Sequence, residues 1–212
     1  MQTSVVSEDL LERWCLLGDH RATRAAGRDL LARWAEPHRR YHDLAHLRAV
    51  LDRVDELAAH ADDPDAVRLA AFFHDAVYEP LSPDNEERSA LLAEQFLGVL
   101  GLHPARVRHV AALVRVTATH QPTAADRDAA VLCDADLAIL ASSPADYAAY
   151  AAAVRQEYAA VPDEVFNPRR AEILNGLLNR AALFLTATAR REWEDLARRN
   201  VTAELTLLRA GG

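Results

Sequence analysis

The sequence carries a nearly uninterrupted apolar stretch at positions 69–78, Leu69-Ala70-Ala71-Phe72-Phe73-His74-Asp75-Ala76-Val77-Tyr78. A segment that is apolar around its whole circumference predicts a buried central helix. His74 and Asp75 lie side by side within it, and a buried charge is costly unless it is paired or binds a metal. For such a pair alone, the simplest interpretation is a core histidine hydrogen-bonded to a neighbouring carboxylate.

Two further segments contain the same residue types. Upstream lies Tyr41-His42-Asp43-Leu44-Ala45-His46, and downstream lies Leu132-Cys133-Asp134-Ala135-Asp136-Leu137. A histidine, a His-Asp pair and a distant aspartate form a nitrogen-and-oxygen donor set that suits a divalent metal. Taken together, the three segments predict a metal site.

Apolar periodicity predicts helices along the rest of the chain. The predicted helices span residues 7–35 (as one helix or two), 43–60, 69–78, 85–99, 128–141 and 189–208, and others begin at Pro104, at Ser143 and after Arg170. There are no repeats and no obvious linker. We therefore predict one all-α domain covering residues 1–212.

The composition disfavours several classes of function. The net charge is −8 and no basic block occurs, which disfavours general nucleic-acid binding. The chain has no lysine, which removes Schiff-base chemistry and a Walker lysine. No apolar run approaches transmembrane length, and the N-terminus lacks a signal-like region. Cys15 and Cys133 form no CxxC pair, which fits free thiols in a reducing cytoplasm. The absence of a long apolar run predicts no membrane partner.

Helix geometry indicates which candidate ligands point towards the core. At 100° per residue, His46 falls on the edge of the apolar stripe of helix 43–60, and His42 points in a similar direction one turn earlier. An HxxxH pair fits a half-exposed helix start equally well. Asp134 and Asp136 point about 200° apart, so they cannot both face one ion. Asp136 falls within the apolar arc and is the predicted ligand; its alternative role is to accept a buried hydrogen bond from Arg155 or Tyr158.

The order of His46, the pair His74-Asp75 and Asp136 on successive helices resembles the pattern found in the HD superfamily of metal-dependent phosphohydrolases. The segment 41–46 is similar to the YHNxxH element of cyclic-nucleotide phosphodiesterases, with Asp43 where those enzymes have Asn. A broader resemblance links the chain to an uncharacterised bacterial branch of predicted HD hydrolases. The matching segments are 73–78, 85–86 with 89–90, 119–120, 132–137, 154–158 and 197–200. The resemblance implies an HD-domain-like helical bundle.

The resemblance and the donor set together imply roles for individual residues. One divalent ion per chain (Mn, Mg, Zn, Fe, Co or Ni) is expected on His46, His74, Asp75 and Asp136. His42 is the expected acid for the leaving oxygen, and Asp75 or Glu86 is the expected acceptor of the proton from water. The candidates for substrate binding are His120, Arg155, Arg169 and Arg170. The alternative for His120 is to contact a metal ligand without binding the metal itself. For each arginine, a surface ion pair is the simpler interpretation.

The leading hypothesis is the hydrolysis of a nucleotide or another small phosphate ester by a metal-activated water. The first alternative is a di-iron oxygenase, because some HD-fold proteins oxidise their substrates. The second is a ligand-binding or regulatory protein that retains the metal. A second metal and oxygen consumption would distinguish the oxygenase. A homodimer is compatible with the sequence.

Overall fold

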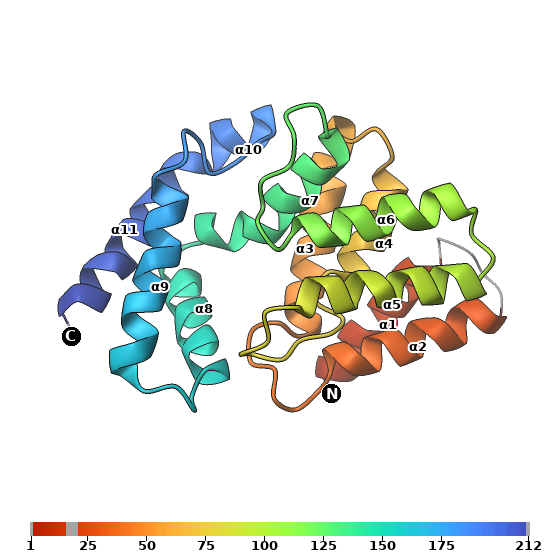
Figure 1. Cartoon of the computed structure of the whole chain (residues 1–212), viewed down its shortest axis with the longest axis horizontal. Helices are drawn as coiled ribbons and strands as arrows, with labels where there is room; N and C mark the ends of the chain where they lie inside the picture. The colour runs from red at the N-terminus through yellow and green to blue at the C-terminus, as the bar shows by residue number, and fades with distance from the viewer. Residues whose placement is uncertain (1, 16–20, 211–212) are drawn as a thin grey trace.

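A computed structural model of the chain describes residues 2–15 and 21–210 (Figure 1). All regular elements in these two ranges are helical, which confirms the all-α prediction. The helices are α1 (Gln2–Cys15), α2 (Arg21–Trp34), α3 (Leu44–Leu57), α4 (Pro64–Phe73), α5 (Asn85–Val99), α6 (Pro104–Val116), α7 (Arg127–Leu137), α8 (Pro144–Glu157), α9 (Asp163–Leu178), α10 (Ala187–Glu192) and α11 (Glu194–Ala210), with short 3-10 helices η1 (Ala58–His60) and η2 (Ala138–Ala141). No helix in the described ranges has the length and apolar character needed to cross a membrane.

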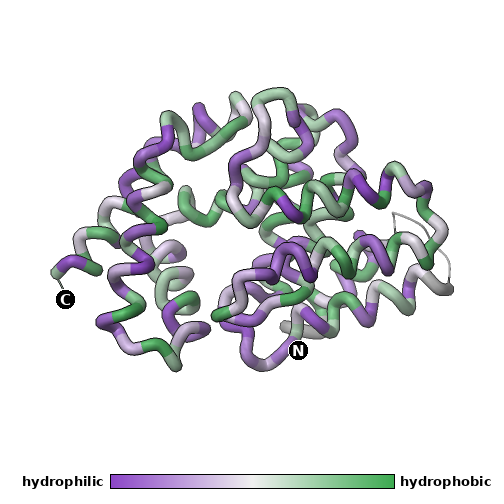
Figure 2. The backbone as a smooth tube through the Cα atoms, viewed as in Figure 1, coloured by the Kyte–Doolittle hydropathy of each residue, from purple (hydrophilic) through white to green (hydrophobic). Residues whose placement is uncertain are grey.

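Helix α4 lies at the centre of the fold, as the apolar stretch predicts. It packs against α3, α5, α6 and α7, and its residues from Leu69 to Phe73 are all buried. In Figure 1, α5 and α6 run alongside each other next to it, while α8, α9 and α11 form a separate layer at the C-terminal end. Hydrophobic and hydrophilic stretches alternate along most helices in Figure 2, as expected where each helix buries one face.

The central helix lies earlier in the chain than predicted: it spans Pro64–Phe73, so it ends at Phe73 and not near Tyr78. Residues at a helix end need new partners for their carbonyl groups. Here the Trp34 indole donates to the carbonyl of Phe72, and the Arg39 guanidinium donates to the carbonyls of Asp75 and Ala76. His74 and Asp75 therefore occupy a turn immediately after the helix.

Helix α3 agrees closely with the helix predicted over residues 43–60. Asp43 caps its N-terminus by accepting from the N–H groups of Ala45 and His46. The predicted apolar stripe of α3 is entirely buried. The predicted helical stretch 7–35 covers all of α2 and α1 from residue 7 onwards, although α1 already begins at Gln2. Residues 16–20 of this stretch lie outside the described part of the chain.

Candidate metal centre

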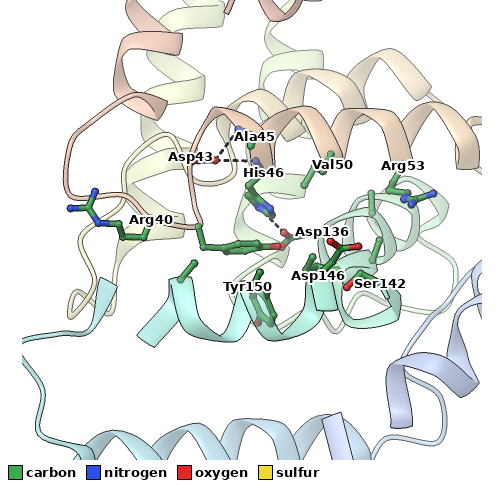
Figure 3. A pocket seen from close by; sticks show the side chains of 17 residues that line it. Arg40, Asp43, Ala45, His46, Val50, Arg53, Asp136, Ser142, Asp146 and Tyr150 are labelled. Carbon is green, nitrogen blue, oxygen red and sulfur yellow. Dashed lines mark hydrogen bonds and ion pairs between the residues drawn. The ribbon is translucent and has the colours of Figure 1, made fainter. Parts of the chain in front are cut away.

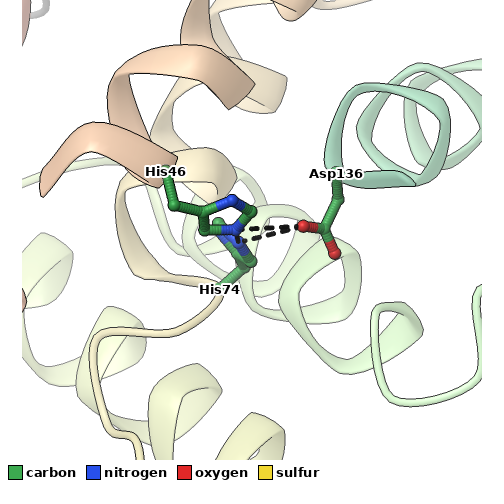
Figure 4. A group of neighbouring side chains, drawn as sticks. All are labelled: His46, His74 and Asp136. Atoms are coloured by element: carbon green, nitrogen blue, oxygen red, sulfur yellow. Dashed lines mark hydrogen bonds and ion pairs between the residues drawn. The ribbon is translucent and has the colours of Figure 1, made fainter. Parts of the chain in front are cut away.

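Three of the predicted ligands converge from different elements: His46 from α3, His74 from the turn after α4, and Asp136 from α7 (Figure 4). One ligating atom from each lies within 4.8 Å of the other two. Nε2 of His46 is 3.2 Å from Nε2 of His74 and 3.2 Å from Oδ1 of Asp136. Both histidine side chains are buried, and that of Asp136 is 15% exposed. We call these three residues the ligand group.

The tautomer of His74 suits metal binding. Its Nδ1 lies 2.8 Å from the carbonyl oxygen of Ala71, which can only accept, so Nδ1 carries the proton. The lone pair of Nε2 is then directed at the other members of the ligand group. This arrangement, in which one ring nitrogen donates to a carbonyl and the other faces the ion, is typical of histidine ligands.

The electrostatics of the ligand group favour a positive charge at its centre. Burial lowers the pKa of His46. Burial also opposes the charge on His74, but Asp75 and Asp136 outweigh it and raise the pKa of His74 to about 9. The pKa of Asp136 lies well below its usual range, because the nearby histidines outweigh the effect of burial. Two buried imidazoles and a carboxylate that is only 15% exposed, held this close, fit a divalent cation.

Asp75, the fourth predicted ligand, lies at the edge of the ligand group. Its Oδ2 is 3.3 Å from Nε2 of His74 and 3.8 Å from Nε2 of His46. The side chain is 13% exposed, and no hydrogen bond to its carboxylate is made by residues 2–15 or 21–210. Asp75 is therefore available either to complete a ligand set or to accept a proton.

A buried arginine that sequence reasoning missed holds the two histidine segments together. The Arg39 side chain is fully buried, and its guanidinium donates to the carbonyls of His42 (2.9 Å) and Asp75 (2.8 Å). It lies between the rings of Trp34 and Tyr78, at 5.4 and 5.5 Å from their centroids. Arg39 thus fixes the loop before α3 against the turn after α4.

Helix α5 fixes the chain that follows this turn. The Ser89 hydroxyl accepts from the N–H of Val77, and the Asn85 side chain both accepts from the N–H of Glu79 (3.0 Å) and donates to its carbonyl (2.9 Å). Both residues belong to segments that carry the family resemblance, where the sequence indicated no role for them. Their observed role is to fix the path of residues 77–79.

His42 is held by Glu157, a second residue that sequence reasoning missed. Nδ1 of His42 lies 2.7 Å from Oε2 of Glu157, which also accepts from the Tyr78 hydroxyl (2.8 Å). Oε1 of Glu157 accepts from the N–H groups of Arg40, Tyr41 and His42. The carboxylate is fully buried, whereas the His42 side chain is 22% exposed.

These contacts alter both pKa values. Burial lowers the pKa of His42, but the hydrogen bond to Glu157 and the nearby carboxylates outweigh it, so the pKa is raised. Burial acts to raise the pKa of Glu157, yet His42 and the N–H groups of Tyr41 and Arg40 hold it far below its usual range. Nε2 of His42 makes no hydrogen bond within the described residues. The imidazole is therefore held in place through Nδ1, and its Nε2 is free to form a hydrogen bond with a bound small molecule.

His120 lies against a member of the ligand group. Its Nε2 is 2.7 Å from Oδ2 of Asp136, the oxygen that does not face His46. His120 has a positive φ of 51°, and the Arg180 guanidinium donates to the carbonyls of His120 and Thr119. This geometry makes His120 a residue that orients Asp136, which was one of its two predicted roles.

The three predicted substrate arginines are engaged within the protein. The Arg155 guanidinium donates to Asp163 and to two backbone carbonyls. That of Arg170 forms an ion pair with Glu204 at 2.8 Å, and its side chain is only 10% exposed. Arg169 pairs with the carboxylate three residues further on and is 78% exposed. Arg155 and Arg169 therefore form ion pairs at the surface, which was the simpler interpretation, whereas the ion pair of Arg170 is buried.

Glu86 and Asp134 are also placed apart from the ligand group. Glu86 lies in the first turn of α5 and is partly exposed, and it is not among the residues whose ligating atoms cluster. Asp134 is fully buried on the other side of α7, where it accepts from the N–H groups of Leu185 and Thr186 at 2.7 Å each.

A cavity of about 370 Å³ opens beside the ligand group, between α3 and α8 (Figure 3). His46 and Asp136 line it, and Arg40 lies at its edge in Figure 3. The Tyr41 ring packs against His46 at 4.7 Å and against Tyr150 at 4.6 Å between ring centroids. We call this space the metal-side cavity, because it gives access to two members of the ligand group.

No protein-family model matches the chain, and no curated protein or solved structure matches it significantly. The function is therefore inferred from the residues of this chain and from their geometry.

Proposed function

We propose that the protein is a metal-dependent phosphohydrolase of the HD type that hydrolyses a small phosphate ester. The observation that carries this proposal is the proximity of two different histidine arrangements. The ligand group presents two buried imidazoles and a carboxylate, and the ring of His42 lies 5.6 Å from the ring of His46 without joining that group. One arrangement suits a metal and the other suits proton transfer.

The chemistry expected at the ligand group follows from its donors. When bound there, a divalent ion would polarise a phosphoryl oxygen and lower the pKa of a water molecule. His46, His74 and Asp136 would hold the ion. His120 would keep Asp136 in orientation through its 2.7 Å contact, as outer partners of metal ligands do.

His42 is the proposed general acid. A proton donor for a leaving oxygen works best when its pKa lies near the working pH. Glu157 raises the pKa of His42 above its ordinary value, which favours the protonated imidazolium, and it also fixes the ring through Nδ1. Nε2 is then the atom that gives its proton to the leaving oxygen.

Asp75 is the proposed proton acceptor. It lies within 3.3 Å of a member of the ligand group, and its carboxylate is partly exposed and free of hydrogen bonds from the described residues. Glu86 was an alternative from the sequence, but no such contact supports it. We propose that Asp75 accepts a proton from the attacking water.

We further propose a cytoplasmic location. Cys15 and Cys133 are both buried free thiols, which is typical of proteins kept in reducing compartments.

The test is a screen of the metal-reconstituted protein against a panel of phosphate esters, with release of inorganic phosphate or of the alcohol as the readout. We expect turnover that chelation abolishes and that His42→Ala reduces while its metal content stays unchanged. Oxygen consumption by protein that holds two irons per chain, without phosphate release, would instead support the di-iron alternative. Metal binding without either activity would support the regulatory alternative.

A further inference from the structure

A second cavity, of about 410 Å³, lies beside His42 and is separate from the ligand group. Helices α8 and α9 and the loop before α5 enclose it. Its lining is rich in aromatic and aliphatic side chains, including Tyr150, Val154, Tyr158, Val165, Phe166 and Ile173. This volume and this lining are typical of sites for small organic ligands.

Charge at this cavity is already neutralised. Arg169 and Arg170 line it, but each is paired with a carboxylate of the protein, Glu172 and Glu204 respectively. The Tyr150 hydroxyl accepts a hydrogen bond from Arg170, at 3.0 Å. A polyphosphate would need these arginines unpaired. The lining therefore suits an uncharged, apolar occupant.

Two exposed side chains at the cavity suit the same kind of occupant. Val165 and Ile173 are 55% and 60% exposed, both on α9. Large aliphatic side chains on a surface are unremarkable when scattered singly. Here they line one concave space together with Phe166 and Tyr158, so a bound apolar group would cover them.

The position of His42 indicates which part of a substrate this cavity would bind. His42 lines this cavity, whereas His46 and Asp136 line the metal-side cavity, and Tyr150 contributes to both. A general acid must lie within hydrogen-bond reach of the oxygen that it protonates. The leaving alcohol therefore lies on the His42 side, and the phosphoryl group lies towards the ligand group.

We infer that this second cavity, the leaving-group cavity, binds the uncharged aromatic or bulky apolar alcohol portion of a phosphate ester. The inference rests on the proposed function. The water oxygen bonds to phosphorus while Asp75 takes one of its protons. The bond between phosphorus and the alcohol oxygen breaks, and that oxygen takes a proton from His42. The products are the free alcohol and phosphate, so no further reactant is needed.

Two measurements test this inference. The first compares kcat/KM for 2-(2-naphthyl)ethyl phosphate with that for ethyl phosphate, which has the same primary alkyl leaving oxygen but no aromatic portion to place in the cavity. The second measures binding of 2-naphthol to metal-free protein by fluorescence, which needs no catalysis. We expect preference for the naphthyl ester, and saturable naphthol binding.

The variants Val165→Asp and Ile173→Asp place a charge at the cavity without disturbing the core, because both side chains are exposed. Each should weaken naphthol binding by about tenfold, since apolar contact is lost and a carboxylate must be desolvated. The matched control is Leu207→Asp on α11, at a side chain that is 73% exposed and lies outside both cavities. It should bind naphthol as the wild type does.

The outcomes separate this inference from the proposed function. Naphthol binding that is absent, or that is unaffected by both α9 variants, overturns the leaving-group cavity even if esters are hydrolysed. Naphthol binding that the α9 variants weaken, without hydrolysis of any ester, supports an apolar binding site but overturns the proposed function. Equal kcat/KM values for the two esters would overturn the role of the cavity in substrate choice.

Discussion

Asp134 and Asp136, two residues apart on α7, serve opposite sides of that helix. Oδ1 of Asp136 lies 3.2 Å from Nε2 of His46, in the ligand group. Both oxygens of Asp134 instead accept from backbone N–H groups at residues 185 and 186, so this carboxylate anchors the segment that precedes α10. Two carboxylates so close in sequence thus have separate functions, and their variants should fail in different ways.

For Asp134→Asn we expect a loss of stability with the metal retained. The amide offers only one acceptor oxygen, so one N–H group of residue 185 or 186 loses its partner. Leaving a buried donor unsatisfied costs about 1–3 kcal/mol in the free energy of unfolding. Urea denaturation and metal titration of this variant and of Asp136→Asn measure both effects. Weakened metal binding in Asp134→Asn with no change in Asp136→Asn would contradict the assignment.

Replacement of Arg39 by Met should destabilise the fold and weaken metal binding together. The carbonyls of His42, Asp75 and Ala76 would lose their donor. Leaving a buried acceptor without its donor costs about 1–3 kcal/mol in the free energy of unfolding. Thermal unfolding and metal titration measure the two effects, and Arg48→Met, at an exposed arginine on α3, is the control. A stable Arg39→Met protein with wild-type metal affinity would refute this role.

Glu157→Gln should move the pH profile of kcat. Activity needs protonated His42, so it falls as the pH rises through the pKa of His42 in the folded protein. Glu157 raises that pKa above the ordinary value of 6.5. Without the carboxylate, burial would lower it, and the basic limb of the profile would shift to lower pH. A lower kcat with an unmoved basic limb would indicate that Glu157 has only a structural role. Glu172→Gln, at the exposed partner of Arg169, is the control.

Asp75→Asn and Glu86→Gln separate the two proposed proton acceptors. The first should lower kcat by roughly a hundredfold or more, the usual contribution of a general base. The second should have little effect, since Asp75 lies within ion-pair distance of both histidines of the ligand group, whereas no such contact of Glu86 occurs among the described residues. Metal content must be measured alongside, because Asp75 lies at the edge of the ligand group. A large loss of kcat in Glu86→Gln alone would reverse the assignment.

Local sequence signals predicted much of the fold. The boundaries of α5 and the start of α6 agree with the prediction, because Pro104 and the turn residues before α5 are strong local signals. The start of α3 was likewise predicted at residue 43, where Asp43 caps the helix. The start of α9 was not, since that helix begins at Asp163 and includes Pro168. Proline removes one backbone hydrogen bond, but tertiary packing evidently outweighs this cost.

In the candidate site, too, some residues were predicted from the sequence and others were missed. Its histidines and aspartates were predicted because polar residues in apolar helical stretches are conspicuous. Glu157 and Arg39 were missed because their contacts are distant in sequence: Glu157 lies 115 residues from His42, and Arg39 lies 36 residues from Asp75. The role of Asp134 was also missed, since α7 buries both of its sides and periodicity then distinguishes no solvent face.

Metal content measured by elemental analysis tests the central claim most directly. Wild-type protein, expressed with divalent metals present and then dialysed, should carry about one ion per chain, as expected for a site with three to four protein ligands. His74→Ala should lose that ion while its circular dichroism still shows a helical fold, and Asp134→Asn should retain it. Full retention of the metal by His74→Ala, or its absence from the wild type, would contradict the account.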